Sequence, residues 1–174
     1  MLTWLTPNKY AVTGASSGMG LVTTQLLASR GASISLADIN EEGLKSAIAT
    51  LPSSQEHMYT VVDVRDGGKV DSWIKSTVEK YGKLNGAINM AGIITKATPV
   101  KDLTDADWDF SFSVNTKGVF NCLRAQLNAL QDGGSIVSCE DHDLLAHSLT
   151  FLTGLCSQRL RPIRRTRQCS LLRQ

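Results

Sequence analysis

A glycine-rich segment near the start of the chain has the residue types and spacing of a phosphate-binding turn. Gly14, Gly18 and Gly20 follow Thr13 in the pattern Thr-Gly-x-x-x-Gly-x-Gly. Glycine accepts a positive φ, and its missing side chain lets the backbone approach a pyrophosphate and lets a helix pack closely on a sheet. Backbone N–H groups at the start of a following helix would attract the anion. The pattern predicts dinucleotide binding, although short glycine patterns also occur in loops without such a role.

An acidic residue further along the chain supports this prediction. Asp38 lies 24 residues after Gly14, close to the ~20-residue separation expected for a carboxylate that binds the ribose hydroxyls. A carboxylate there would repel a 2′-phosphate, and no Lys or Arg lies in the glycine turn or directly after Asp38. The sequence therefore favours NAD over NADP. The alternative role for Asp38 is structural, as a cap for a helix predicted over 41–51.

The elements that must position these residues alternate between strand and helix. Apolar runs bounded by turn residues predict strands, and apolar residues at helical spacing predict helices. The predicted strands cover about 10–12, 33–37, 58–62, 84–89 and 135–138, and the predicted helices cover about 18–30, 41–51, 70–81 and 104–130. This order predicts an α/β fold, a Rossmann-like doubly wound sheet of about five parallel strands with helices on its faces.

The glycine segment resembles the signature of the short-chain dehydrogenase/reductase family, and other segments agree with that family in order and spacing. Asp63-Val64 resembles the pair whose Asp meets the adenine. Asn89-Met90-Ala91-Gly92 is similar to the family's Asn-Asn-Ala-Gly, with Met90 in place of the second Asn. Val114-Asn115-Thr116-Lys117-Gly118 resembles the helical segment whose Asn belongs to the catalytic set. The resemblance covers about residues 7–138, the N-terminal, nucleotide-binding part of such a protein.

This resemblance implies an oxidoreductase that transfers a hydride between a nicotinamide dinucleotide and a secondary alcohol or ketone. It implies a single catalytic residue in this chain, Asn115. Arg124 occupies a place that is often basic in relatives and is sometimes assigned to the cofactor. The residues that we assign to cofactor binding are Gly14, Ser16, Gly18, Met19, Gly20, Asp38, Asp63, Val64, Asn89, Ala91, Gly92 and Arg124.

The family's catalytic Ser and its Tyr-x-x-x-Lys do not occur at the matching positions. The three tyrosines all precede the fifth predicted strand, none has a Lys four residues later, and no Lys follows Lys117. The Ser would fall near Asp141, and Ser138 matches the preceding strand end. We therefore expect the chain to be inactive as given, with a small-molecule substrate only in a full-length form. The alternative function is a non-catalytic NAD-binding or protein-interaction module.

Residues 139–174 depart from the family pattern. They hold six Arg, three acidic residues and no Lys, whereas residues 1–138 hold 12 Lys or Arg and 13 acidic residues. We divide the chain into a dinucleotide-binding domain over 1–138 and an irregular, Arg-rich tail over 139–174, which we expect to be poorly ordered. One hypothesis for the tail is a gene model disturbed near codon 139, and the other is a real truncated relative.

The start of the tail could suggest a metal site. Its polar side chains there are Asp141, His142, Asp143 and His147. We interpret them as a solvated loop and expect no metal. The Arg-rich segment lacks interleaved aromatic residues, so we expect no nucleic-acid partner.

Composition excludes other classes of protein. The net charge of +2 and the 42% hydrophobic content are ordinary for a globular domain. No apolar run reaches the ~18 residues that span a bilayer, and the first residues lack the pattern of a secretory signal, so we expect no membrane partner and a cytoplasmic location. The oligomeric state and the substrate stay open. The cysteines, which we interpret as free thiols, are Cys122, Cys139, Cys156 and Cys169.

Overall fold

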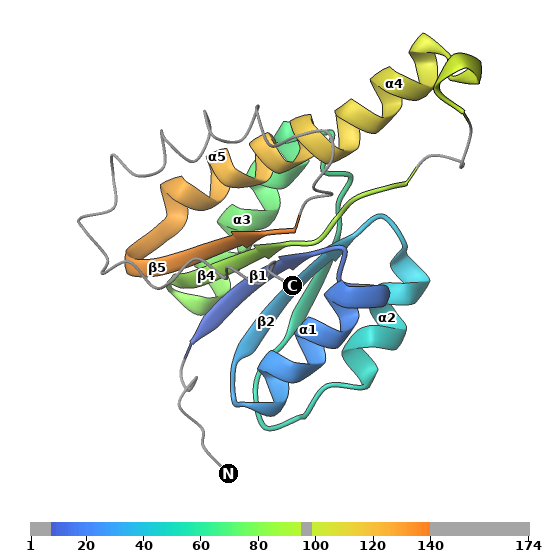
Figure 1. The fold of residues 1–174 in the computed structure, drawn as a ribbon. Coiled ribbons are helices and arrows are strands. Elements are labelled where there is room, and N and C mark those ends of the chain that lie inside the picture. Colours follow the sequence, from blue (N-terminus) through green and yellow to red (C-terminus); the bar gives the residue numbers. More distant parts are fainter. Residues whose placement is uncertain (1–7, 95–98, 140–174) are drawn as a thin grey trace, which may run out of the picture.

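The computed structural model of the chain describes residues 8–94 and 99–139. Its centre is a five-stranded sheet in the order β3-β2-β1-β4-β5, with every neighbouring pair parallel. Helices cover both faces of this sheet, α1 and α2 on one face and α3 and α5 on the other (Figure 1). The strands are β1 Lys9–Thr13, β2 Ser33–Asp38, β3 Met58–Val61, β4 Leu84–Asn89 and β5 Leu130–Ser138. This arrangement confirms the predicted doubly wound, Rossmann-like fold.

The helices begin and end at the residues that the sequence favours for those positions. The α3 helix ends at Gly82, whose φ of 74° gives the left-handed cap that glycine adopts at little cost. Thr104 and Asp107 form a reciprocal capping box at the start of α4, as predicted from their spacing. The helices are α1 Gly18–Ser29, α2 Glu41–Ala49, α3 Gly67–Tyr81, α4 Asp105–Phe112 and α5 Val119–Ala129, with the 3₁₀ turn η1 at Val100–Asp102.

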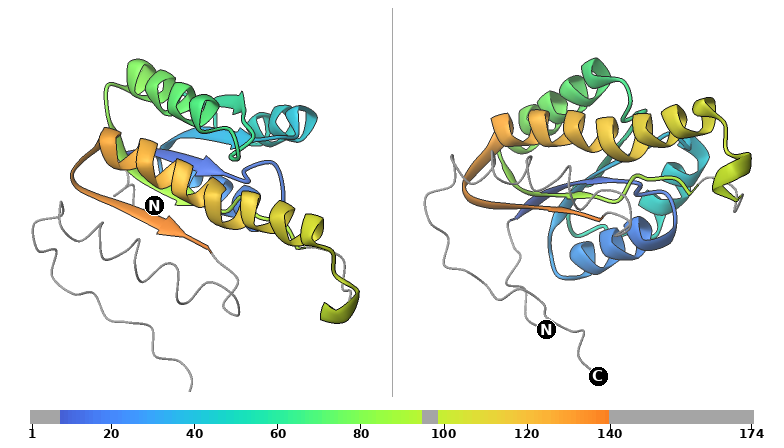
Figure 2. Two further views of the ribbon diagram at one scale, coloured as in Figure 1. Left: turned by 90° about the horizontal axis from the view of Figure 1, so that it is seen from above. Right: turned by 45° about the horizontal axis from the view of Figure 1, so that its top comes forward.

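The long helix predicted over 104–130 contains a segment of another kind. Between α4 and α5, Ser113–Gly118 forms the π-helical segment η2, so that α4, η2 and α5 follow one another as one rod (Figure 2). The apolar spacing of the sequence does not distinguish one wider turn from an α-helical one. Such π-helical turns are uncommon and often occur at functional sites.

The core consists of one apolar cluster on each face of the sheet. The first joins α1 and α2 to β1 and β2 through residues such as Ala28, Leu36 and Leu44. The second joins α3 and α5 to the sheet around Trp73, which is 1% exposed and donates its indole N–H to Ser35 Oγ at 2.8 Å. Burial of each such large apolar side chain contributes about 1.5–3 kcal/mol. The two clusters hold the carboxyl ends of the strands at one edge.

The last strand is longer than predicted. β5 begins at Leu130, whereas the sequence predicted a strand only over 135–138. Leu130 pairs with Leu84, and a register shift between Leu84 and Gly86, together with the positive φ of Gly133, accommodates the irregular start.

Some sequence predictions lie outside the described residues. The tail over 139–174 is described only at Cys139, so the division into two parts stays a prediction. The His and Asp residues of the tail likewise lie outside the described ranges. Within residues 8–94 and 99–139, no group of His, Cys, Asp or Glu side chains could hold a metal ion. None of the helices in these ranges is long and apolar enough to cross a membrane.

Candidate functional site

A cavity of about 310 Å³ lies at the carboxyl ends of four of the five strands. β1 pairs with β2 on one side and with β4 on the other, so the strand order reverses at this point, where doubly wound sheets bind their ligands. Its wall is apolar apart from a few polar groups. The residues that line it are Gly14, Ser17, Gly18, Met19, Gly20, Ala37, Asp38, Ile39, Val62, Asp63, Val64, Arg65, Met90, Ala91, Gly92, Ile93, Phe110 and Val114.

The glycine turn needs its glycines for two different reasons. Gly14 has a φ of 65°, and a Cβ there would lie 2.8 Å from the backbone of Met90. A Cβ at Gly20 would collide with the carbonyl oxygen of Gly14, so the start of α1 packs directly on the turn. Gly18 has a φ of 51°, but nothing lies within 4 Å of a Cβ there. The space beside Gly18 is therefore open to a ligand.

The start of α1 offers backbone donors to an anion. Ser17 is the N-cap, and its side chain makes no capping hydrogen bond. At this end of the helix, the N–H of Leu21 donates to the carbonyl oxygen of Ser17 at 3.0 Å. N–H groups in the first turn of a helix have no intrahelical acceptor, and the helix dipole adds positive potential. This first turn lines the cavity through Gly18, Met19 and Gly20. Its backbone N–H groups are therefore suited to bind the pyrophosphate of a dinucleotide.

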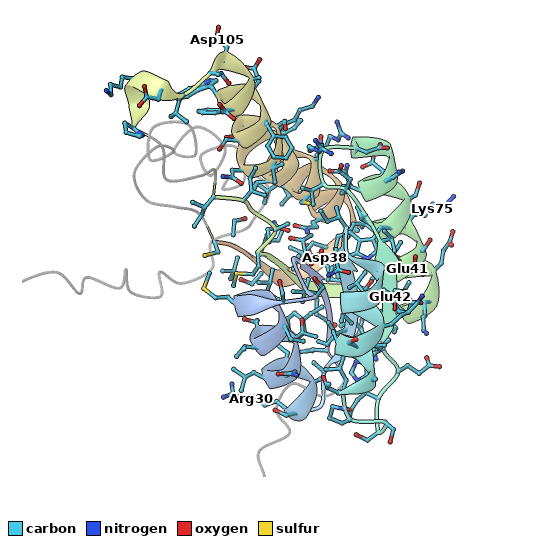
Figure 3. All side chains as sticks on the ribbon, turned by 90° about the vertical axis from the view of Figure 1, so that its right-hand side faces the viewer. Arg30, Asp38, Glu41, Glu42, Lys75 and Asp105 are labelled. Carbon is cyan, nitrogen blue, oxygen red and sulfur yellow. The ribbon has the colours of Figure 1, made fainter. Side chains whose placement is uncertain are left out.

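Asp38 ends β2 beside this turn, at the level of the start of α2 (Figure 3). Its Oδ2 accepts a hydrogen bond from the N–H of Ser16, and its Oδ1 accepts one from the N–H of Asn40, each at 3.1 Å. These two bonds hold the carboxylate at the cavity. The N-cap of α2 is Asn40, whose Oδ1 accepts from Gly43 N at 3.0 Å. Asp38 therefore lies where a carboxylate that accepts hydrogen bonds from ribose hydroxyls is expected.

The loop after β3 brings a basic residue to the cavity. Nε and Nη2 of Arg65 donate to the carboxylate of Asp63 at 2.5–3.0 Å. The Cζ atom of Arg65 lies 5.3 Å from the ring centroid of Phe110 on α4. The guanidinium beside Asp63 holds the pKa of that carboxyl below its usual range. Arg65 was not among the predicted site residues, and its place directly after the Asp63-Val64 pair was the only signal.

A buried amide on α5 holds the same loop. Asn121 is 3% exposed, and its Nδ2 donates to the carbonyl oxygens of Val64 at 2.9 Å and Arg65 at 3.2 Å. One turn earlier, a Cβ at Gly118 would lie 2.6 Å from Cγ2 of Val64. The helix therefore fixes the backbone of the loop that lines the cavity. Sequence analysis did not select Asn121, although an Asn on the apolar face of a helix was a possible signal.

The segment after β4 is fixed from both sides. Thr13 Oγ1 accepts hydrogen bonds from Met90 N and Ala91 N, both at 3.1 Å. From the π-helical segment, Asn115 Oδ1 accepts from Ile93 N and Asn115 Nδ2 donates to Ile93 O, both at 2.9 Å. Asn115 therefore acts on the backbone at the edge of the cavity and is not itself among the residues that line it.

Most of the predicted cofactor residues meet at this cavity. Ser16 contributes through its backbone bond to Asp38. The predicted residues that line the cavity are Gly14, Gly18, Met19, Gly20, Asp38, Asp63, Val64, Ala91 and Gly92.

Besides Ser16, two predicted cofactor residues, Asn89 and Arg124, do not line the cavity. Asn89 is 2% exposed and exchanges two hydrogen bonds with the side chain of Gln126. Arg124 lies on α5, where its Nη2 is 3.3 Å from the carboxylate of Asp71 and its Cζ lies 5.7 Å from the ring centroid of Phe120. In the described part of the chain, their side chains thus serve contacts between elements.

Comparison with known proteins agrees with this geometry. The sequence model described as short chain dehydrogenase matches residues 8–140. The short-chain dehydrogenase/reductase aba4 of Botryotinia fuckeliana (strain B05.10) is 43% identical over 149 residues, which cover 83% of this chain and 55% of that protein. The chain thus spans about half the length of the curated relatives that it matches.

Solved structures give the same result. The crystal structure of levodione reductase is 31% identical, with a TM-score of 0.75, and the match covers 85% of this chain and 63% of that one. The structure of NAD⁺-bound xylitol dehydrogenase is 32% identical, with a TM-score of 0.71, and the match covers 75% and 52% of the two chains. The chain belongs to the short-chain dehydrogenase/reductase family.

Proposed function

We propose that this chain binds NAD in the cavity at the carboxyl ends of β1 to β4, as the nucleotide-binding part of an oxidoreductase. The observation that carries the proposal is that two groups suited to a dinucleotide, the first turn of α1 and the Asp38 carboxylate, lie side by side at the ends of β1 and β2. The open first turn of α1 offers N–H donors for a pyrophosphate, and the carboxylate of Asp38 offers acceptors for ribose hydroxyls. When bound, the cofactor would supply the hydride.

The charges of the cavity support NAD over NADP. Asp38 and Asp63 are the acidic lining residues, and the basic lining residue Arg65 is already paired with Asp63. A 2′-phosphate would meet the Asp38 carboxylate without an unpaired cation among the lining residues. Like charges at close range raise the free energy of binding, so the phosphate is disfavoured.

The residues in this chain support binding but not turnover. The sequence contains no Tyr followed four residues later by Lys and no Lys beyond Lys117. Proton transfer to a substrate oxygen needs a positioned acid or base. Asn115 uses its side-chain amide on Ile93, so it cannot take that role alone. We infer that the 174 residues bind the dinucleotide without transferring a hydride.

In a full-length form, the reaction would be oxidation of a secondary alcohol or reduction of a ketone. Two similar proteins, named levodione reductase and xylitol dehydrogenase, support this class of reaction. The alternative is a non-catalytic interaction module, which the absence of a Tyr-x-x-x-Lys from these 174 residues favours.

Calorimetric titration of the full chain with NAD⁺ and NADP⁺ tests the proposal. We expect NAD⁺ to bind at least about tenfold more tightly, since the repulsion of one phosphate by one carboxylate is worth more than about 1.4 kcal/mol. Equal affinities would contradict the argument from Asp38, and absence of binding to either would favour the interaction module. A parallel hydride-transfer assay should show no turnover. Turnover that disappears in Asn115→Ala would contradict the inactivity.

A further inference from the structure

Arg65 and Phe110 join two separate parts of the chain at the cavity. Arg65 belongs to the loop after β3 and Phe110 to α4, and both line the cavity. The guanidinium carbon lies 5.3 Å from the ring centroid, within the range of a cation–π contact. The two side chains therefore form a common surface at the β3 end of the cavity.

The order of the strands fixes how a dinucleotide must run through the cavity. Its pyrophosphate fits the glycine turn after β1, and its adenosine ribose fits Asp38 after β2. β3 is the next strand in that direction, so the base attached to this ribose reaches the loop that carries Arg65. The nicotinamide half runs the other way, over the end of β4 toward Met90.

The guanidinium of Arg65 is held in place before a ligand binds. Nε and Nη2 donate to Asp63, and Asn121 Nδ2 donates to the backbone carbonyl of Arg65 at 3.2 Å. The ring of Phe110 adds a third contact. A side chain fixed in this way loses little further freedom on binding, which favours affinity.

The ion pair decides which part of a ligand Arg65 can bind. Its Nε–Nη2 edge is occupied by Asp63, and the same carboxylate offsets its positive charge. An Arg that reads a phosphate commonly uses a two-pronged edge and an uncompensated charge. A planar guanidinium also has a face, which stacks on aromatic rings and bases.

We propose that Arg65 is a specificity-determining residue whose guanidinium, fixed by Asp63 and Phe110, is the surface on which the purine base of the dinucleotide stacks. This inference rests on the proposed NAD-binding function and adds the residue that selects the adenine half.

Calorimetric titrations of the full chain with NAD⁺, NADP⁺ and AMP test this role, and ligand-observed NMR reports on nicotinamide mononucleotide, which has no purine. Arg65→Ala removes the guanidinium, and Arg65→Lys keeps the charge without the planar face. We expect both variants to lose about tenfold in affinity for NAD⁺ and AMP, because the stacking of the base on the planar guanidinium would be removed. Binding of nicotinamide mononucleotide should not change. Lys75→Ala, at an exposed cation on the outer side of α3 (Figure 3), is the matched control and should bind like wild type.

Each outcome decides the inference. If wild type binds NAD⁺ and both Arg65 variants bind AMP as tightly as wild type does, the purine base does not stack on Arg65. The proposed function then still stands. Loss of affinity for NADP⁺ alone would show that Arg65 reads a phosphate and would also overturn the inference. If wild type binds none of the four nucleotides, the proposed function fails as well. Circular dichroism checks that each variant folds, and Arg65→Lys decides the test if Arg65→Ala does not fold.

Discussion

The side-chain amides of Asn89 and Gln126 exchange two hydrogen bonds in the protein interior, with N···O distances of 3.0 and 2.8 Å. Both residues are almost fully buried. Asn89 ends β4 and Gln126 lies on α5, so the pair ties this helix to the strand that leads into the cavity. Asn89 also donates to Ser138 Oγ at 3.2 Å, which adds β5 to the same network. Asn89 thus supports the site from the core.

Replacing Gln126 with Leu should lower the free energy of unfolding by about 2 kcal/mol, because Asn89 would keep a buried amide without its main partner. Urea denaturation measures the change. Gln25→Leu is the matched control, since the Gln25 amide bonds to Thr50 Oγ1 at the surface, and it should change stability by less than about 0.5 kcal/mol. If Gln126→Leu were as stable as the control, the pair would contribute nothing measurable.

Local patterns were sufficient to predict the elements of the fold. β4 was predicted over 84–89 and lies at Leu84–Asn89, because a short apolar run between turn residues has a local signal. The capping residues at Thr104 and Gly82 were predicted for the same reason. The early start of β5 was not predictable, since its pairing with Leu84 depends on a register shift between two strands.

In the candidate site, too, residues with a local sequence signal were predicted, whereas residues placed by distant contacts were not. The glycine turn and Asp38 were found because their spacing along the chain carries the signal. Arg65 was not predicted to line the cavity, because its place there depends on contacts with Asp63 and Phe110, and Phe110 is distant in sequence. Arg124 was predicted at the cofactor but pairs with Asp71. The direction of a side chain on a helix depends on what packs there, and one sequence does not contain that information.

Gly18 and Gly82 form a matched pair for testing the glycine turn. Both have positive φ, 51° and 74°, and nothing lies within 4 Å of a Cβ at either position. Ala at either position should therefore cost a similar free energy of unfolding, about 1–2 kcal/mol for the left-handed backbone. Only the Cβ at Gly18 lies at the cavity, so Gly18→Ala alone should weaken binding of NAD⁺.

Urea denaturation and calorimetric titration of both variants separate the two effects. Comparable loss of NAD⁺ affinity in Gly82→Ala would mean that binding responds to stability in general and not to the space beside Gly18.

Replacing Asp38 with Ala should reduce the affinity for NAD⁺ by about 10- to 100-fold, because hydrogen bonds to a charged group contribute about 1.5–3 kcal/mol. The affinity for NADP⁺ should fall less, since the repulsion of its phosphate also disappears. The ratio of the two affinities should therefore approach one in competitive titrations. Asp132→Ala removes an exposed carboxylate on β5 and should leave both affinities unchanged. An unchanged preference for NAD⁺ in Asp38→Ala would place the discrimination elsewhere in the cavity.

His57 should make the stability of the fold depend on pH. Its Nδ1 accepts a hydrogen bond from the N–H of Ile34 on β2 at 3.2 Å, so the ring proton lies on Nε2, 3.1 Å from the carbonyl of Pro52. Burial of the ring lowers the pKa of His57, the backbone bond to Pro52 opposes this, and the ammonium groups of Lys80 and Lys9 lower the pKa further. The folded protein therefore favours the neutral ring.

The sign of the effect follows from proton binding. Because the folded-state pKa lies below the ordinary value of 6.5, the unfolded chain binds more protons as the pH falls below that value. The stabilisation is present above about pH 6.5 and decreases on acidification. His57→Asn keeps a side-chain acceptor for Ile34 but does not titrate, so its free energy of unfolding should fall less between pH 7.5 and pH 5 than that of wild type. Urea denaturation across this range measures both curves, and parallel curves would show that His57 does not couple stability to pH.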